Sequence, residues 1–89
     1  MLQQTTTIVN KLGLHARAAA KFVTQASLFE SDINVKRNNL DVNGKSIMGV
    51  MMLAAAKGTE IELIIDGIDE NQAMQSLLEL IANRFDEAE

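Results

Sequence analysis

The sequence has 89 residues, of which 47% are hydrophobic and 22% charged, and it contains neither proline nor cysteine. This size and balance predict one globular domain over residues 1–89. Without cysteine there is no disulfide or thiol chemistry, and a single histidine leaves almost no ligands for zinc or copper, so we expect no metal and no cofactor. The net charge of −4 and the scarcity of aromatic residues argue against nucleic-acid binding.

Charge is unevenly distributed along the chain. Residues 1–29 contain Lys11, Arg17 and Lys21 and no acid, whereas residues 60–89 contain nine acids and one base. The basic third predicts a local site for an anion or an acidic partner. No segment has the pattern of a signal peptide, and the longest apolar stretch has about half of the ~20 residues that a membrane span needs. We therefore expect a cytoplasmic protein without membrane insertion.

The first half of the chain alternates between strand and helix patterns. β-branched residues over 4–10 indicate a strand, and apolar residues recur at three- and four-residue spacing in the helix expected from Ala16. Period-two alternation then predicts a strand over 33–36 and a short return strand over 40–42. Asn38-Asn39 between them is typical of a tight turn with positive φ.

The second half predicts a short helix, a strand and a long helix. The short helix covers 46–53 and the strand covers 61–65. Asp69, with Gln72 three residues later, is expected to cap a last helix that continues to the chain end. The complete order β-α-β-β-α-β-α indicates an α+β sandwich with helices on one face of a sheet.

His15 lies where the first strand gives way to the first helix, in the segment Gly13-Leu14-His15-Ala16-Arg17. The first backbone N–H groups of a helix lack internal partners and carry part of the helix dipole, and Arg17 adds a cation with several donors. Because both disfavour a second positive charge, we expect a neutral imidazole with a free lone pair, which can act as a nucleophile. The same groups would stabilise a phosphoryl group on the ring.

Two other interpretations of the chain compete with a phosphoryl carrier. In a noncatalytic α+β interaction module, His15 would merely cap the helix. A small hydrolase is disfavoured because we find no base–nucleophile pair and no metal set, and because the acids concentrate in the last third of the chain.

Three segments of the chain carry a family resemblance. They are Lys11–Arg17 with its alanine-rich continuation, Gly44–Leu53, and Lys57–Ile61 leading to Asp66-Gly67 and Asp69-Glu70. In this order they resemble the histidine-containing phosphocarrier protein (HPr) family of the bacterial phosphotransferase system. The resemblance implies an open-faced β-sandwich, in which three helices cover one side of a four-stranded antiparallel sheet.

The resemblance also implies a function for His15. The protein would be a stoichiometric carrier rather than a true catalyst: it takes a phosphoryl group from phosphoenolpyruvate, through enzyme I, onto Nδ1 of His15. It then passes the group to an enzyme IIA-type acceptor or to a regulatory target. Arg17 and the backbone amides of Ala16, Arg17 and Ala18 would hold the phosphate. The family usually has proline after the arginine, where this chain has Ala18.

Ser46 has two interpretations. A serine directly before a short helix is typical of an N-cap. By resemblance, Ser46 is also the site that an ATP-dependent HPr kinase/phosphorylase modifies in many bacteria. Both interpretations stay open from the sequence.

The short helix carries more apolar surface than one core can cover. At about 100° per residue, one arc of the helix holds the following residues: Ile47, Met48, Met51, Met52 and Ala55. Val50 and Leu53 point elsewhere. The methionines either fill gaps in the core or form an exposed, adaptable docking surface. By resemblance, this surface and Ala16, Arg17, Ala20 and Lys21 form the partner-binding face around His15 of a protein expected to be a monomer.

Overall fold

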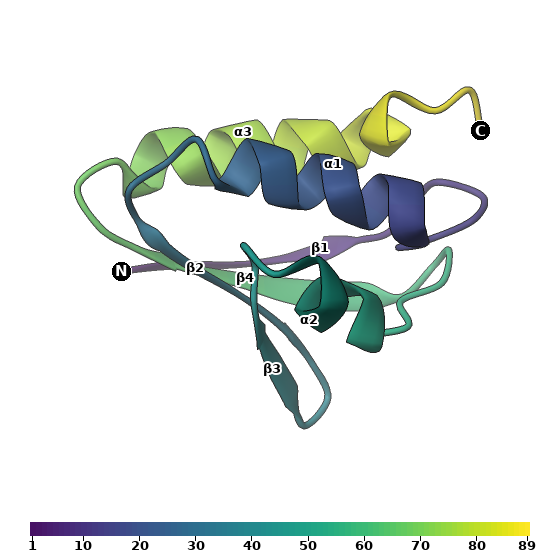
Figure 1. Cartoon of the computed structure of the whole chain (residues 1–89), viewed down its shortest axis with the longest axis horizontal. Helices are drawn as coiled ribbons and strands as arrows, with labels where there is room; N and C mark the ends of the chain where they lie inside the picture. The colour runs from purple at the N-terminus through teal and green to yellow at the C-terminus, as the bar shows by residue number, and fades with distance from the viewer.

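The strands and helices follow one another in the predicted order. A computed structural model describes all residues 1–89 (Figure 1). Its elements are β1 (Leu2–Thr7), α1 (Ala16–Ala26), β2 (Asp32–Arg37), β3 (Leu40–Asn43), α2 (Ile47–Met52), β4 (Glu60–Asp66), α3 (Glu70–Ala82) and a short 3-10 turn, η1 (Arg84–Asp86). At the predicted turn, Asn38 adopts a φ of 54°, which confirms a left-handed residue there.

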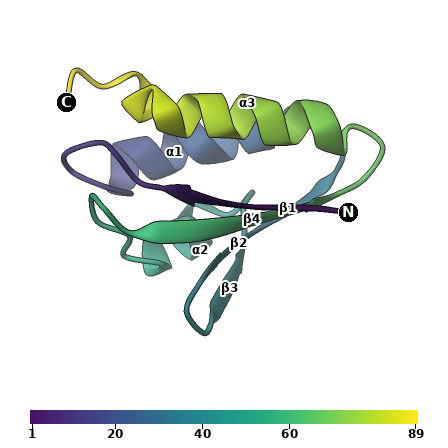
Figure 2. The same ribbon diagram turned by 180° about the vertical axis from the view of Figure 1, so that it is seen from behind.

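The four strands form one antiparallel sheet in the order β1-β4-β2-β3. Figures 1 and 2 show α1 and α3 side by side along one face of this sheet, with α2 near β3. Alternate side chains of β4, those of Ile61, Leu63 and Ile65, are buried, as expected for a strand covered on one face only. The architecture is therefore the open-faced α+β sandwich that the resemblance implied. No helix is long and apolar enough to cross a bilayer.

The core lies between the helices and the sheet. Register places Ile33 of β2 opposite Ile65 of β4, and Val35 opposite Leu63, so both pairs face the helices. The two long helices each bury one stripe, as their amphipathic spacing predicts. The stripes comprise Ala18, Ala19, Phe22 and Ala26 of α1 and Ala73, Met74, Leu77 and Ile81 of α3.

Two predicted boundaries differ from the structure. The first strand ends at Thr7 rather than at residue 10, because Thr7 is opposite Glu60, where β4 begins, and the ladder stops there. The last helix does not continue to the chain end: it stops at Ala82, and the backbone then turns through three left-handed residues. This turn directs the side chain of Phe85 into the core, where it is completely buried.

The predicted N-cap position of Asp69, at the start of α3, is confirmed, but the predicted side-chain cap is not formed. Its carboxylate instead accepts from the Ser31 hydroxyl at 2.5 Å, the Glu30 amide at 2.9 Å and the Ser31 amide at 3.0 Å. These donors, led by the Ser31 hydroxyl, hold the pKa of Asp69 below its usual value. Asp69 thus joins the α1–β2 loop to the start of α3.

Candidate functional site

The loop from β1 to α1 is shaped by close contact with the loop after α2. The Leu14 amide donates to the Ala55 carbonyl at 2.9 Å. Gly13 adopts a left-handed φ of 68°, and a Cβ built on it would lie 2.5 Å from the Ala55 oxygen and 2.9 Å from Ala56 Cα. Only glycine fits both the conformation and the space, so Gly13 fixes the approach of the chain to His15.

His15 is the N-cap residue of α1. Its backbone is extended, with φ −73° and ψ 178°, and its carbonyl accepts the first helical hydrogen bond from Ala19 at 2.8 Å. The amides of Ala16, Arg17 and Ala18 precede that bond and have no acceptor within the helix. The side chain of His15 makes no capping hydrogen bond, so His15 occupies the N-cap position without capping the helix through its imidazole.

Arg17 is exposed in the first turn of α1 and lines a groove between α1 and the C-terminal turn together with Lys21 and Asp86. The guanidinium and the three free amides place positive charge at one end of the helix. Ala18 is completely buried, and its amide adds a donor that the family's usual proline lacks. This end of α1 can therefore bind an anion.

The imidazole of His15 is paired with a carboxylate from the end of the chain. Nε2 of His15 lies 2.5 Å from Oε2 of Glu87, and the two side chains are 29% and 13% exposed. The other carboxylate oxygen, Oε1, accepts from Asn10 Nδ2 at 3.0 Å. Burial alone would raise the pKa of Glu87, but the hydrogen bonds from Asn10 and His15 outweigh burial, and the pKa lies below its usual value. Glu87 is therefore a carboxylate at neutral pH.

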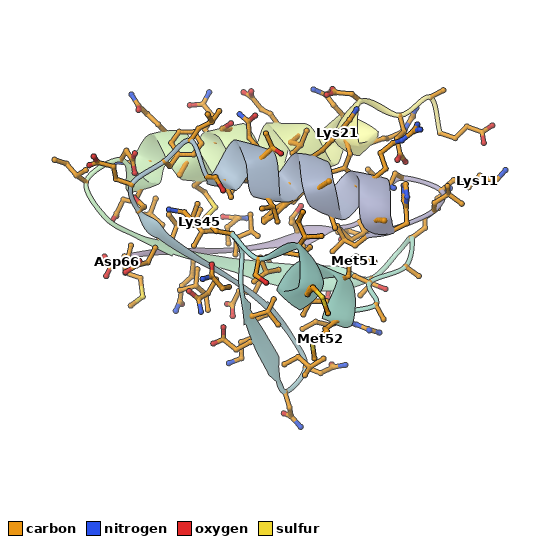
Figure 3. All side chains as sticks on the ribbon, in the orientation of Figure 1. Lys11, Lys21, Lys45, Met51, Met52 and Asp66 are labelled. Carbon is orange, nitrogen blue, oxygen red and sulfur yellow. The ribbon has the colours of Figure 1, made fainter.

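Several contacts hold the C-terminal tail against the start of α1. Lys21 Nζ donates to the Phe85 carbonyl at 2.9 Å, and the Lys11 amide donates to the Glu89 carbonyl at 3.0 Å. Figure 3 shows Lys11 and Lys21 at the end of the molecule where the tail lies. The tail therefore lies beside the start of α1, and the ammonium group of Lys21 already has a partner inside the protein.

Sequence reasoning missed Glu87 and Asn10. The fold brings an acid from the acidic third of the chain to the only histidine. Their separation of 72 positions along the chain leaves no local spacing signal, and the tail lies beyond the last periodic helix. The charge difference between the two ends of the chain was the one available indication.

Ser46 caps α2, as predicted. Its Oγ accepts from the Gly49 amide at 3.1 Å. Lys45 beside it donates to the carbonyl of Phe29, just beyond the end of α1. Ser46 therefore lies toward the end of α1 opposite to His15.

The exposed apolar residues of α2 form what we call the methionine patch: Ile47, Met48, Met51 and Met52, which are 44, 75, 41 and 63% exposed. Val50 and Leu53 are buried, so the predicted division of the helix is confirmed for these six residues. Ala55 is the exception: it lies beyond the helix and is buried. Of the two interpretations of the methionines, exposure favours a surface over core filling (Figure 3).

Comparisons with known proteins agree with this geometry. The family model for the HPr component phosphorylation site of the phosphotransferase system (PTS) matches residues 2–83. Phosphocarrier protein HPr of Neisseria meningitidis serogroup A is 60% identical over the full length of both chains. The crystal structure of HPr-C-His from Thermoanaerobacter tengcongensis aligns over the full length of both chains with a TM-score of 0.95 and 46% identity. A crystal structure of an HPr dimer from the same organism aligns over 98% of this chain and all of that one, with a TM-score of 0.79 and 47% identity.

Fold and site thus define a small α+β protein with a histidine and an exposed arginine at the N-terminus of its first helix. The chain belongs to the HPr family of phosphocarrier proteins.

Proposed function

We propose that this protein accepts a phosphoryl group from enzyme I on Nδ1 of His15 and passes it to an enzyme IIA-type acceptor. The observation that carries the proposal is the position of His15 at the N-cap of α1, beside three free amides and the exposed Arg17. Because Nε2 is hydrogen-bonded to the Glu87 carboxylate, Nδ1 is the ring nitrogen that is free to react. Family membership supports partners within the phosphotransferase system.

The proposed transfer is a single displacement at phosphorus. The lone pair of Nδ1 attacks phosphorus, an N–P bond forms, and the bond between phosphorus and enzyme I breaks with its electrons returning to enzyme I. The amides of Ala16, Arg17 and Ala18 and the Arg17 guanidinium stabilise the phosphoryl oxygens, as phosphoryl transfer mainly requires. Reversal of the same step on a different partner delivers the group.

The test is incubation with enzyme I and phosphoenolpyruvate. We expect an acid-labile, base-stable adduct on the wild-type protein and none on His15→Ala, followed by ³¹P NMR. No adduct on a folded wild-type protein, or an adduct that His15→Ala retains, would refute the proposal. Arg17→Ala should still accept the group, but about tenfold more slowly, because one charged donor is lost.

The methionine patch is the surface that we propose for docking, together with Ala16, Ala20, Arg17 and Lys21. The patch is connected to the loop before His15, since the Ala55 carbonyl in the loop after α2 accepts a hydrogen bond from the Leu14 amide. Methionine suits a surface that must fit both a donor and an acceptor of the phosphoryl group.

Regulation by an HPr kinase/phosphorylase at Ser46 is a second proposal, supported by the position of this hydroxyl at a helix N-terminus, where the fold tolerates a phosphate. Incubation with such a kinase and ATP, compared with Ser46→Ala, tests it.

We further propose a cytoplasmic monomer as the working form. Sedimentation over a range of protein concentrations tests the monomer against a dimer like that of the T. tengcongensis HPr. Cell fractionation tests the location.

A further inference from the structure

The candidate for a further role is Glu87, whose carboxylate is held from two sides. Oε2 lies 2.5 Å from His15 Nε2, and Oε1 accepts from Asn10 Nδ2 at 3.0 Å. The same nitrogen of Asn10 donates to the Gly13 carbonyl at 2.8 Å, and Asn10 is completely buried. One buried amide thus connects the loop that precedes His15 with the residue that contacts its ring.

The tail that carries Glu87 is fixed before and after this residue. Phe85 is completely buried, and its carbonyl accepts from Lys21 Nζ. On the other side, the Glu89 carbonyl accepts from the Lys11 amide at 3.0 Å. The contact between Glu87 and His15 is therefore built on an anchored segment rather than on a free chain end.

The chemistry of the contact assigns the proton on the imidazole. A carboxylate only accepts hydrogen bonds, so the ring must donate through Nε2–H, and the lone pair of a neutral ring then lies on Nδ1. When Nδ1 bonds to phosphorus, positive charge develops on the ring, and the carboxylate at Nε2 is placed to balance it. The helix terminus and Arg17 disfavour positive charge on the ring, whereas the carboxylate of Glu87 favours it. Glu87 therefore offsets their effect.

We infer that Glu87 is a positioning residue for His15: it holds the Nε2–H form of the imidazole, aims Nδ1 at the incoming phosphoryl group and balances the charge that the ring gains. This inference rests on the proposed function of His15. It adds a residue from the tail to a site otherwise built from the start of α1.

The experiment compares Glu87→Ala, Glu87→Asp and the control Glu89→Ala with the wild type. Glu89 is the matched control because it lies two residues away in the same tail, is exposed and pairs only with Lys11, at 3.2 Å. The first readout is the downfield proton signal of His15 Nε2–H in a ¹⁵N-resolved NMR spectrum, which a hydrogen bond protects from exchange with water. The second is the initial rate of phosphoryl uptake at limiting enzyme I.

We expect the Nε2–H signal in the wild type and in Glu89→Ala, and its loss in Glu87→Ala. Phosphoryl uptake should fall about tenfold in Glu87→Ala, as for loss of a hydrogen bond to a charged group, and stay within about twofold in Glu89→Ala. Glu87→Asp retains a carboxylate and should recover part of both readouts. A backbone amide spectrum of each variant verifies the fold.

Two results would overturn the inference. One is a Nε2–H signal that survives in folded Glu87→Ala. The other is loss of the signal with an unchanged uptake rate, which would leave a contact without a role in transfer. If the wild type accepts no phosphoryl group at all, the proposed function fails, while the NMR comparison still reports separately on the contact.

Discussion

Replacement of Gly13 by alanine should destabilise the protein through two separate effects. The left-handed φ of 68° costs an L-residue about 1–2 kcal/mol. The new Cβ would also lie 2.5 Å from the Ala55 oxygen and 2.9 Å from Ala56 Cα, and both are backbone atoms that cannot rotate away. Displacing them adds about 1–3 kcal/mol, as for overpacking in a core. The two effects together lower the free energy of unfolding by about 2–5 kcal/mol.

Gly58→Ala separates the two effects. Gly58 has a φ of 89°, but a Cβ built there meets nothing within 4 Å, so only the conformational cost of about 1–2 kcal/mol applies. Urea unfolding followed by circular dichroism measures both variants. With a slope of about 1 kcal/mol per molar urea, the midpoint of Gly13→Ala should lie about 1–3 M below that of Gly58→Ala.

The Gly13 variant should also transfer phosphate more slowly when folded, because the displaced Ala55 carbonyl accepts from Leu14, directly before His15. Equal urea midpoints for the two alanine variants would refute the reasoning, since they would show that the overlap of the new Cβ with the Ala55 backbone does not lower the free energy of unfolding. Equal uptake rates would refute only the link from this contact to His15.

Three further outcomes follow from single contacts. Ser46→Ala removes the acceptor for the Gly49 amide and should lower the free energy of unfolding by about 1 kcal/mol, measured by urea unfolding; Ser46→Asp should restore most of it. Asp69→Asn should destabilise the protein at pH 6 but less at acid pH. Because the pKa of Asp69 is lower in the folded protein, its carboxylate stabilises the fold at pH values above its usual pKa of 3.8, and this contribution is lost as the pH falls below 3.8. Thermal melts at several pH values measure the difference between wild type and variant, and a constant difference would contradict the argument. Met48→Glu places a charge at a position that is 75% exposed, so the free energy of unfolding should change by less than about 0.5 kcal/mol. The KM with enzyme I should rise, and an unchanged KM would show that Met48 is not part of the docking surface.

Most of the fold could be predicted because its signals are local. Alternation in β4 and the helical stripes follow directly from burial on one face, and Ser46 needs only the next three residues to act as a cap. Asp69 shows where such reasoning fails. Its position before a helix was correct, but donors from Glu30 and Ser31, far away in the sequence, took the place of its expected local partners.

The candidate site divides in the same way. The helix terminus, His15 and Arg17 are neighbours in the sequence, so their meeting could be predicted. Glu87 reaches His15 only because three left-handed residues follow the last helix and return the chain toward α1. None of these three residues is glycine, and no motif marks the turn, so the sequence offered no local signal for it.

The strand order β1-β4-β2-β3 has a consequence for how the molecule assembles. β1 has no partner other than β4, so its hydrogen-bond ladder cannot form until a segment more than 50 residues later in the chain is in place. Closing so large a loop is costly in entropy and slows folding relative to a helical bundle of equal size. The loop that leads from β1 to His15 therefore gains its shape late, together with the sheet. Separated from the rest of the chain, the first third would keep its histidine and arginine but lose the contacts of Leu14 with Ala55 and of His15 with Glu87.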